Sequence, residues 1–155
     1  MLRVQGARLS AGGAANGQVQ FVSKADVLVQ VAGSDPQVDG TSTIDDQVLA
    51  GALNRGGDVT LTSRAANIGD FGGWGVVFDN KAQVVKAEGG NASLTVNSNR
   101  NIEMRAGSAI QSKSGALNVD FNADAEGAAG QDAITPEGQP FPRRGSIVLN
   151  NATVE

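Results

Sequence analysis

The residues of this sequence that are best suited to acid–base chemistry are carboxylates. The 155 residues include no His and no Cys, which excludes Ser–His–Asp and Cys–His catalysis and zinc sites built from His or Cys. Glu103 and Asp120 lie beside apolar neighbours in alternating segments, so both should face outward, where two carboxyl groups could hydrolyse a glycosidic bond. No apolar pocket that would raise a carboxyl pKa is visible around them. We therefore predict no catalytic residues and a protein that is not an enzyme.

Two aromatic residues are the first candidates for ligand binding. Phe71 and Trp74 flank two glycines, and an exposed Trp on a rigid scaffold can present its ring to a sugar. The alternative is that both rings pack against the body of the protein. Asp79 and Asn80 stand between two short apolar segments, and this pattern predicts a tight turn that makes 70–81 a hairpin.

Arg143 and Arg144 are the second pair of candidate binding residues. They end the segment 123–144, which holds three of the four prolines in the chain and should be an extended, irregular excursion. The two guanidinium groups can contact an anionic partner, or they can simply be solvated.

The segment 33–54 is the most acidic of the long segments. A calcium site needs oxygen ligands at tight, regular spacing, and the aspartates here lack that spacing, so we predict a solvated acidic loop and no metal site. Thr43 could cap a short helix with Val48 and Leu49 on one side, although Gly51 weakens this helix. The aspartates of the segment are Asp35, Asp39, Asp45 and Asp46.

The charge balance and the remaining motifs exclude several partners. The chain has 12 Lys and Arg against 16 Asp and Glu, with no basic stripe, so nucleic acid is not an expected partner. No phosphate-binding motif is present. Without His, Tyr or Cys, an ordinary haem ligand would have to be Met104 or Met1, and we predict no cofactor. No run of residues approaches the roughly 18 apolar residues of a membrane span.

The candidate residues are carried by a repeated pattern of short apolar segments. VQFVSKADV (19–27) and LTVNSNRNI (94–102) both read apolar-x-apolar-x-Ser-x-x-(Asp or Asn)-(Val or Ile). VTLTSRAANI (59–68) fits with one extra residue, which places Asn67 and Ile68 in the same phase. The equivalent pairs of the first two segments are Phe21 with Val96, Ser23 with Ser98, Asp26 with Asn101, and Val27 with Ile102.

The spacing of these segments predicts the fold. The interval from Leu94 to Leu117 holds three apolar pulses, which fits one coil of three short strands with one row of side chains inward and one outward. A single coil can bury its inner row only by stacking on other coils. We predict an all-β chain folded as a parallel β-helix (solenoid) of about five to six coils, and a β-sandwich is the alternative.

The predicted β-helix accounts for the whole chain as one segment. Residues 1–155 form this segment, with insertions in the turns near 33–54, 70–81 and 123–144. The side chains expected to stack in one inner column are Leu61, Leu94, Val96 and Val119.

The repeats resemble those of a known family. Arg100–Ile102, Ala109–Ser112, Leu117–Val119 and Asn122–Gly127 follow one another in the order found in filamentous-haemagglutinin-like exoproteins, the passengers of bacterial two-partner secretion. The resemblance covers 56–155 well and the N-terminal part loosely. It implies a right-handed β-helix that an outer-membrane transporter secretes and that is displayed on the outer surface of a Gram-negative bacterium.

The resemblance also implies a function. We expect a non-enzymatic segment of an adhesin, in which the β-helix is a stiff shaft and the loops attach to a glycan or protein on a host or neighbouring cell. The alternative is a polysaccharide-binding or polysaccharide-processing β-helix, such as a lyase or a phage tailspike. Ice binding needs ranks of Thr-x-Thr, and only Thr60 and Thr62 qualify.

The two ends of the chain share one phase of the repeat. LRVQGARL (2–9) matches IVLNNATV (147–154), which places Val4 in the position of Leu149. Neither end shows the polar face of a terminal capping repeat. We therefore expect a slice of a longer β-helix that is open at both ends and that either associates end to end or frays at its terminal coils.

Overall fold

The computed structural model of the protein describes residues 3–4, 17–34, 41–65, 75–125 and 145–155. Across these ranges the chain forms thirteen short strands and one helix, and every strand pairing between them is parallel. The prediction of an all-β chain is confirmed. The alternative of a sandwich of antiparallel hairpins finds no support in these pairings.

The strands form three parallel sheets, which we call A, B and C. Sheet A contains, in spatial order, β1 (Arg3–Val4), β4 (Ser42–Asp45), β3 (Val27–Gln30), β6 (Val76–Phe78), β9 (Ile102–Met104) and β12 (Ile147–Leu149). Sheet B contains β11 (Leu117–Ala123), β8 (Ala92–Ser98), β5 (Asp58–Ser63) and β2 (Gln18–Ser23). Sheet C contains β13 (Thr153–Val154), β10 (Ala109–Ser112) and β7 (Gln83–Lys86).

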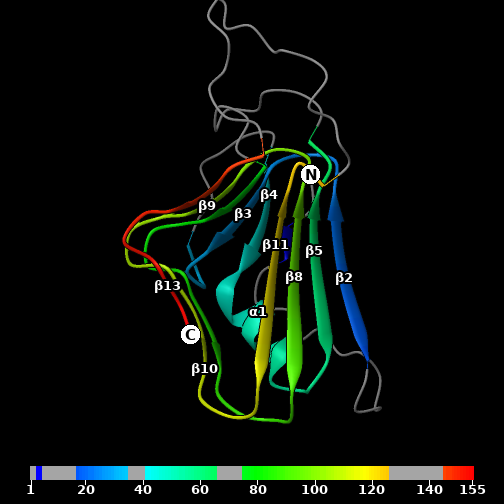
Figure 1. Ribbon diagram of the computed structural model, residues 1–155, viewed down its shortest axis with the longest axis vertical. Helices are drawn as coiled ribbons and strands as arrows, with labels where there is room; N and C mark the ends of the chain where they lie inside the picture. Colours follow the sequence, from blue (N-terminus) through cyan, green and yellow to red (C-terminus); the bar gives the residue numbers. More distant parts are fainter. Residues whose placement is uncertain (1–2, 5–16, 35–40, 66–74, 126–144) are drawn as a thin grey trace, which may run out of the picture.

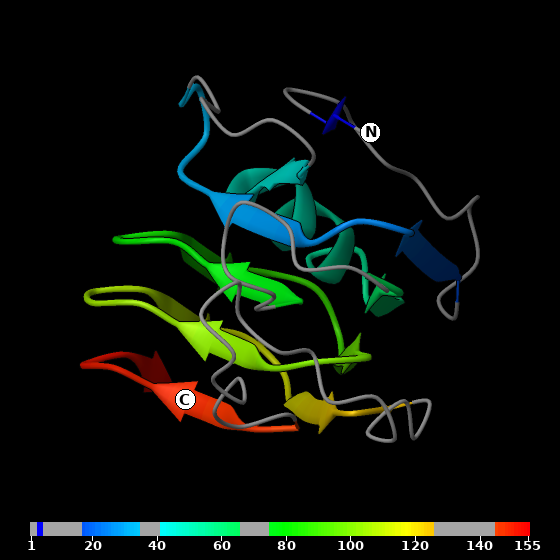
Figure 2. The ribbon, with the colours of Figure 1, turned by 90° about the horizontal axis from the view of Figure 1, so that it is seen from above.

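The chain visits the three sheets in a fixed order. It passes from sheet B to sheet A to sheet C three times in succession, through β5–β6–β7, β8–β9–β10 and β11–β12–β13. We call each such passage a circuit. Figure 1 shows the strands of sheet B side by side, and Figure 2, seen from above, shows successive circuits as layers from green to red. Each strand therefore pairs with its equivalent in the next circuit.

The inner rows of the sheets form ranks of apolar side chains that run across the circuits. In sheet B, Leu61 pairs with Phe21 on one side and with Val96 on the other, and Phe121 follows Val96. Leu61, Leu94 and Val96 are 0% exposed, so their predicted inward orientation is confirmed. Val119 pairs with Leu94 and packs against the same core, although it is only partly buried. Strict alternation over six or seven residues produces these ranks.

A serine fixes the corner at which the chain leaves sheet B. The Oγ atoms of Ser23 and Ser98 each accept a hydrogen bond from the backbone N–H two residues later, at 3.0 and 3.1 Å. Ser63 makes the same bond at 3.4 Å. These three serines occupy one rank. A short hydroxyl side chain can accept this hydrogen bond and so stabilise a turn of the backbone. The repeated serine of the sequence therefore has a local structural role.

A second set of side chains ties each circuit to the next, and we call it the corner ladder. Each member accepts a hydrogen bond through its Oδ1 atom from a backbone N–H of the following circuit. The pairs are Asp26 with Gly75 at 3.1 Å, Asn54 with Ala87 at 2.7 Å, Asn91 with Ala116 at 3.0 Å, and Asn101 with Ser146 at 3.0 Å. The predicted equivalence of Asp26 and Asn101 is confirmed, because both side chains hold the corner before a strand of sheet A.

Asp26 performs this role in an unfavourable environment for a charge. It is 3% exposed, and its Oδ2 atom has no hydrogen-bond partner among the described residues. Burial raises the pKa of the Asp26 carboxyl above its ordinary value, while the Gly75 N–H and the positive charge of Arg100 oppose that rise. The neutral side-chain amide of Asn101 accepts the equivalent hydrogen bond, from the Ser146 N–H, without a buried charge.

The predicted hairpin at 70–81 is wrong. Val76–Phe78 forms β6, which lies between β3 and β9 in sheet A and pairs with both in parallel. Val76 rather than Ile68 occupies the rank between Val27 and Ile102. A run of three apolar residues before a turn fits a hairpin arm and a central strand equally well, and the parallel pairing decides between them.

The predicted solvated acidic loop is also wrong where the structure describes it. Asp45 and Asp46 are 3% and 4% exposed. The Asp46 carboxylate accepts hydrogen bonds from the backbone N–H groups of Ala32 and Gln83, at 3.1 and 2.7 Å. Helix α1 (Asp46–Leu53) begins after Asp45, and Thr43, the predicted cap, lies within β4 instead. Asp35 and Asp39 lie outside the described residues.

Helix α1 covers the apolar interior at one end on the side of sheet C. It packs mainly against β7, beside the edge of sheet C at which an equivalent strand of an earlier circuit would lie (Figures 1 and 2). Leu49 and Leu53 are 0% exposed and belong to the main core. Among the described residues, β1 pairs only with β4 and β2 only with β5, so the expectation of an interior open at this end stays a prediction for sheets A and B. Val4 does share a rank with Leu149, as predicted, at opposite edges of sheet A.

Candidate functional site

The end of the molecule opposite α1 is open, and we call it the open end. It is formed by β11, β12 and β13, the last strands of the three sheets. Ile147, Leu149 and Val154 are 46%, 54% and 40% exposed, whereas the residues paired with them one circuit earlier are 0% exposed. Those earlier residues are Ile102, Met104 and Ile110. The apolar ranks therefore stop at a surface where their last members are not covered.

The backbone at the open end is also incompletely paired. In the part of the chain that the structure describes, β11 pairs only with β8, β12 only with β9, and β13 only with β10. The second edge of each of these strands carries N–H and C=O groups without a strand partner. Such an edge can accept another strand by main-chain hydrogen bonding.

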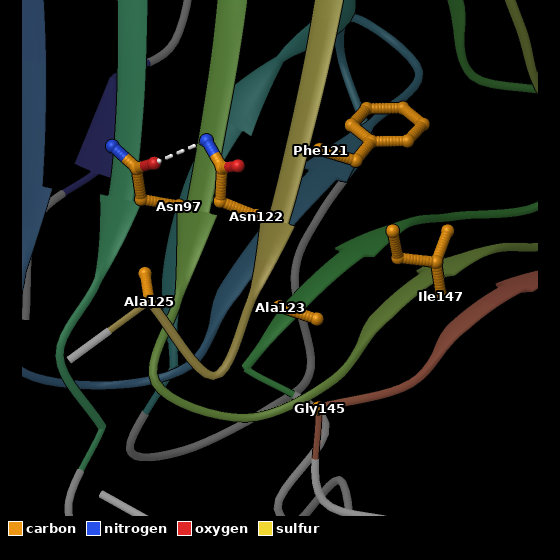
Figure 3. A pocket seen from close by; sticks show the side chains of 7 residues that line it. All are labelled: Asn97, Phe121, Asn122, Ala123, Ala125, Gly145 and Ile147. Carbon is orange, nitrogen blue, oxygen red and sulfur yellow. Dashed lines mark hydrogen bonds between the residues drawn. The ribbon is translucent and has the colours of Figure 1, made fainter. Parts of the chain in front are cut away.

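A pocket of about 470 Å³ lies at the corner where β11 ends and β12 begins. Figure 3 shows Asn97 and Asn122 on one side of β11, and Phe121 and Ile147 on the other. The Asn122 Nδ2 donates a hydrogen bond to Asn97 Oδ1 at 3.0 Å, and the Phe121 ring packs against Phe78 with centroids 6.2 Å apart. The lining residues are Asn97, Phe121, Asn122, Ala123, Ala125, Gly145 and Ile147.

The lining of this pocket determines what it can bind. It combines two carboxamides with apolar groups, and none of the seven lining residues is charged. Its volume is within the range of small-ligand sites. A neutral polar group with an apolar face, such as a sugar or a peptide backbone, fits this chemistry better than an ion does.

The outer face of sheet B presents polar ranks beside this pocket. Asn97 and Asn122 share one rank with Thr62 and Val22. In the neighbouring rank Thr60 pairs with Thr95, and below it Ser93 Oγ donates to Asp58 Oδ1 at 2.5 Å. Because Val22 and Asn97 flank Thr62, the ranks of Thr-x-Thr that ice binding requires do not form.

The candidate residues inferred from the sequence have mixed outcomes. Phe71, Trp74, Arg143 and Arg144 all lie outside the described residues, so their role stays a prediction. Glu103 and Asp120, the carboxylates considered for catalysis, lie on sheets A and B respectively.

Glu103 belongs to a cluster of charges at the end of β9 and the turn after β6. Its Oε2 atom lies 3.2 Å from Arg105 Nε, and Arg105 Nη1 lies 3.0 Å from Asp79 Oδ1. Both carboxylates are therefore paired with one arginine. Met104, the haem ligand considered above, is 0% exposed in the core, and Met1 is not among the described residues.

Sequence reasoning missed one buried cation. Lys86 is 0% exposed at the inner end of β7, and its Nζ donates hydrogen bonds to the backbone carbonyls of Glu88, Gly89 and Ser114. These carbonyls belong to the turns between sheets C and B in two successive circuits. The signal was available, since Lys86 follows Val84 by two residues and so shares its inward face.

Two further properties concern metals and membranes. Among the described residues, no three or more His, Cys, Asp or Glu side chains gather in a group that could hold a metal ion. Within the same ranges, no helix is long and apolar enough to span a membrane.

Comparisons with known proteins found no similar protein. No protein-family model matches the chain, and neither the curated proteins nor the solved structures include a significant match.

Proposed function

We propose that this chain is a segment of a right-handed parallel β-helix and serves as a stiff, non-enzymatic shaft. The observation that supports the proposal most is the continuity of the ranks, because each strand from β8 onward pairs in parallel with its equivalent one circuit earlier. An architecture of this kind stacks repeats that contact only their neighbours. Length then grows with the number of circuits while the cross-section stays constant.

Two features support stiffness in particular. The turns from sheet B to sheet A after β2 and β8 are short, and a serine fixes each of these corners. The corner ladder adds side-chain hydrogen bonds between circuits. Bending such a stack would lengthen main-chain hydrogen bonds on one side of it. The buried ranks of Val, Leu and Ile oppose compression on the other side, since protein interiors are close-packed.

In this proposal the shaft belongs to a secreted exoprotein of the filamentous-haemagglutinin type on the outer surface of a Gram-negative bacterium. The support is the resemblance of its repeats, and secretion would use an outer-membrane transporter. Attachment to a glycan or protein of a host or neighbouring cell is assigned to the inserted segments. Phe71, Trp74, Arg143 and Arg144 are the residues proposed for it, because aromatic and arginine side chains are common anchors in binding sites.

A glycan array probed with the isolated chain tests the attachment function. We expect binding without cleavage, and loss of that binding in the Trp74→Ala and Arg143→Ala variants. Lys113→Ala is the matched control, because Lys113 is an exposed cation on a turn of the described part. Cleavage of a polysaccharide would overturn the proposal in favour of a processing enzyme. Failure to bind any glycan or cultured cell would leave no role in attachment.

An alternative is that the outer face of sheet B binds a polysaccharide without cleaving it, and one observation supports this alternative. The outer face of sheet B carries hydroxyl and amide side chains in adjacent ranks, next to the pocket of Figure 3. If this face binds the glycan, Thr95→Arg or Asn97→Arg should abolish the array signal. In that case Trp74→Ala should leave the signal unchanged, which separates the two sites.

A further inference from the structure

Two short segments of the chain, NAS (91–93) and NAT (151–153), have the sequence Asn-x-Ser or Asn-x-Thr. This sequence is an acceptor for N-linked glycosylation when the middle residue is not proline and the segment lies at the surface. Asn91 lies in the turn between β7 and β8, and Asn151 lies in the turn between β12 and β13. Both asparagines are exposed, so the sequence and the surface position agree at both.

The exposure of these turns is a property of the stack and not of its last circuit. Asn91 is exposed although β8, which begins directly after it, pairs with a strand on either side, β5 and β11. Asn151 belongs to the last circuit and has a φ of +48°. The turn after β6, a strand that also has neighbours on both sides, likewise presents an exposed residue in the left-handed region, Lys81 with a φ of +64°. Neighbouring circuits therefore leave side chains at such turns in solvent.

We propose that Asn91 is an N-glycosylation site and that Asn151 is a second one. The two polar atoms of the Asn91 side chain have separate roles. Its Oδ1 accepts the corner-ladder hydrogen bond from the Ala116 N–H at 3.0 Å, while its Nδ2 has no hydrogen-bond partner among the described residues. A sugar is attached through Nδ2 and leaves Oδ1 as an acceptor. The modification is therefore compatible with the corner ladder.

The transfer requires a transferase and a sugar that is activated as a diphosphate ester. The Asn91 Nδ2 attacks the anomeric carbon of the sugar. The new C–N bond forms as the C–O bond to the diphosphate breaks, the diphosphate leaves with its carrier, and the amide loses one proton. The hydroxyl two residues after the asparagine is the group by which the transferase recognises the acceptor, so Ser93 is the recognition residue for Asn91.

The environment of Ser93 determines when the transfer takes place. In the folded protein the Ser93 Oγ donates a hydrogen bond to Asp58 Oδ1 at 2.5 Å. Its backbone lies in β8, where β5 pairs on one edge and β11 on the other. A transferase cannot bind this segment as an extended acceptor without breaking both pairings. The transfer therefore precedes the folding of this circuit, and the folded protein then carries the sugar in solvent at the turn.

Mass spectrometry of the protein isolated from the cells that naturally produce it tests the proposal. We expect the tryptic peptide 87–100 to carry a sugar that fragmentation locates on Asn91, and the peptide that begins at Gly145 to carry one on Asn151. Asn97, in the same peptide as Asn91, is followed by Ser98 and Asn99 and should be unmodified. An unmodified Asn91 in this protein would overturn the proposal.

Variants made in the same cells test the recognition residue. Ser93→Ala should reduce the modification of Asn91 to background, Ser93→Thr should retain it, and Asn97→Gln is the matched control that should leave it unchanged. Asn151 in the same molecules reports that the transferase was active, and circular dichroism checks that each variant is folded. Modification of Asn91 that persists in Ser93→Ala would contradict the assignment.

The proposed order of events has its own test. Unmodified protein is incubated with an extract of those cells and the sugar diphosphate, either folded or as a chain held unfolded by several destabilising substitutions. We expect modification of Asn91 in the unfolded chain and at least about tenfold less in the folded one, because opening the circuit costs free energy. Equal modification of the two forms would contradict transfer before folding.

Discussion

At the scale of single residues, Asp26 holds a corner of the fold with one carboxylate oxygen while the other has no partner among the described residues. Because burial raises its pKa above the ordinary value of 3.8, the folded state favours the protonated form. The stabilising effect of that form is fully present below pH 3.8 and is lost as the pH rises through the pKa of the folded state.

Asp26→Asn should therefore stabilise the protein at neutral pH. The amide keeps the acceptor for the Gly75 N–H and removes a buried charge, which is the arrangement that Asn101 already has. The urea midpoint of the variant should exceed that of the wild type at pH 7, and the difference should shrink as the pH falls toward 3.8. Asn101→Asp is the reverse control and should lower the midpoint at pH 7. A pH-independent difference would contradict this explanation.

Lys86 is the second residue whose environment makes a specific prediction. Lys86→Met keeps the length of the side chain but leaves the carbonyls of Glu88, Gly89 and Ser114 without their common donor. Leaving buried acceptors unsatisfied should lower the free energy of unfolding by about 3 kcal/mol. Lys113→Met, at an exposed lysine, should change it by less than about 0.5 kcal/mol. Equal effects in urea denaturation would show that the hydrogen bonds from Lys86 to the three carbonyls contribute nothing to stability.

At the scale of elements, the inner and outer rows of β8 should differ sharply in tolerance. Val96 is 0% exposed and lies between Leu61 and Phe121, so Val96→Asp buries an unpaired carboxylate. We expect a loss of several kcal/mol. Thr95→Asp places the same charge on the outer face and should cost well under about 1 kcal/mol. Thermal melting of both variants measures the difference, and similar melting temperatures would contradict the assignment of the rows.

The connection from sheet B to sheet A also makes a prediction, because β6 begins directly after Gly75. Gly75 has a φ of +83°, and an added Cβ would lie 2.8 Å from the Asn101 carbonyl oxygen. Gly75→Ala should therefore cost about 2–3 kcal/mol through strain and steric conflict. Gly90→Ala has open space around it and should be neutral or slightly stabilising. Chemical denaturation of the two variants tests this contrast, and a well-tolerated Gly75→Ala would contradict the described corner.

The elements also show how far the sequence alone could predict the fold. Segments 19–27 and 94–102 carry the same corner length, so the repeated pattern placed their residues in the correct ranks. The pattern failed after β5, because the next strand of sheet A starts at Val76 instead of Ile68. Spacing identifies a repeat only where the turns have equal length. The unequal turn therefore made β6 look like one arm of a hairpin.

Buried charges were the other failure of prediction, and the reason is physical. Asp46 is stabilised by backbone N–H groups that lie 14 and 37 residues away in the sequence, and Lys86 by a carbonyl 28 residues away. No local pattern contains such partners, so the aspartates suggested a solvated loop and Lys86 was not recognised as buried. For the candidate site, the sequence did predict uncovered apolar ranks at the open end. The pocket of Figure 3 depends on where two distant segments meet, which the sequence does not show.

At the scale of the whole molecule, the two unlike ends should produce a gradient of local stability. The backbone amides of Asp79, Arg105 and Asn150 occupy equivalent positions in three circuits, and each donates to a carbonyl of the circuit before it, at 2.8 to 2.9 Å. In the isolated chain the Asn150 amide should exchange at least about tenfold faster than that of Arg105, because local opening at an uncovered end needs less free energy.

Hydrogen exchange of the isolated chain measures this gradient. Equal protection of all three amides would show that the open end is as stable as the interior.

The hydrogen bonds of the corner ladder all run in the same direction along the sequence, which bears on the order of folding. In all four of its hydrogen bonds the accepting side chain comes earlier in the sequence than the donating amide. A chain that becomes free to fold from its N-terminal side therefore presents finished acceptors to residues that have not yet arrived. In that case each folded layer is the template for the next, and folding can propagate circuit by circuit toward the C-terminus. Propagation of this kind releases its free energy in small steps, one for each circuit that is added.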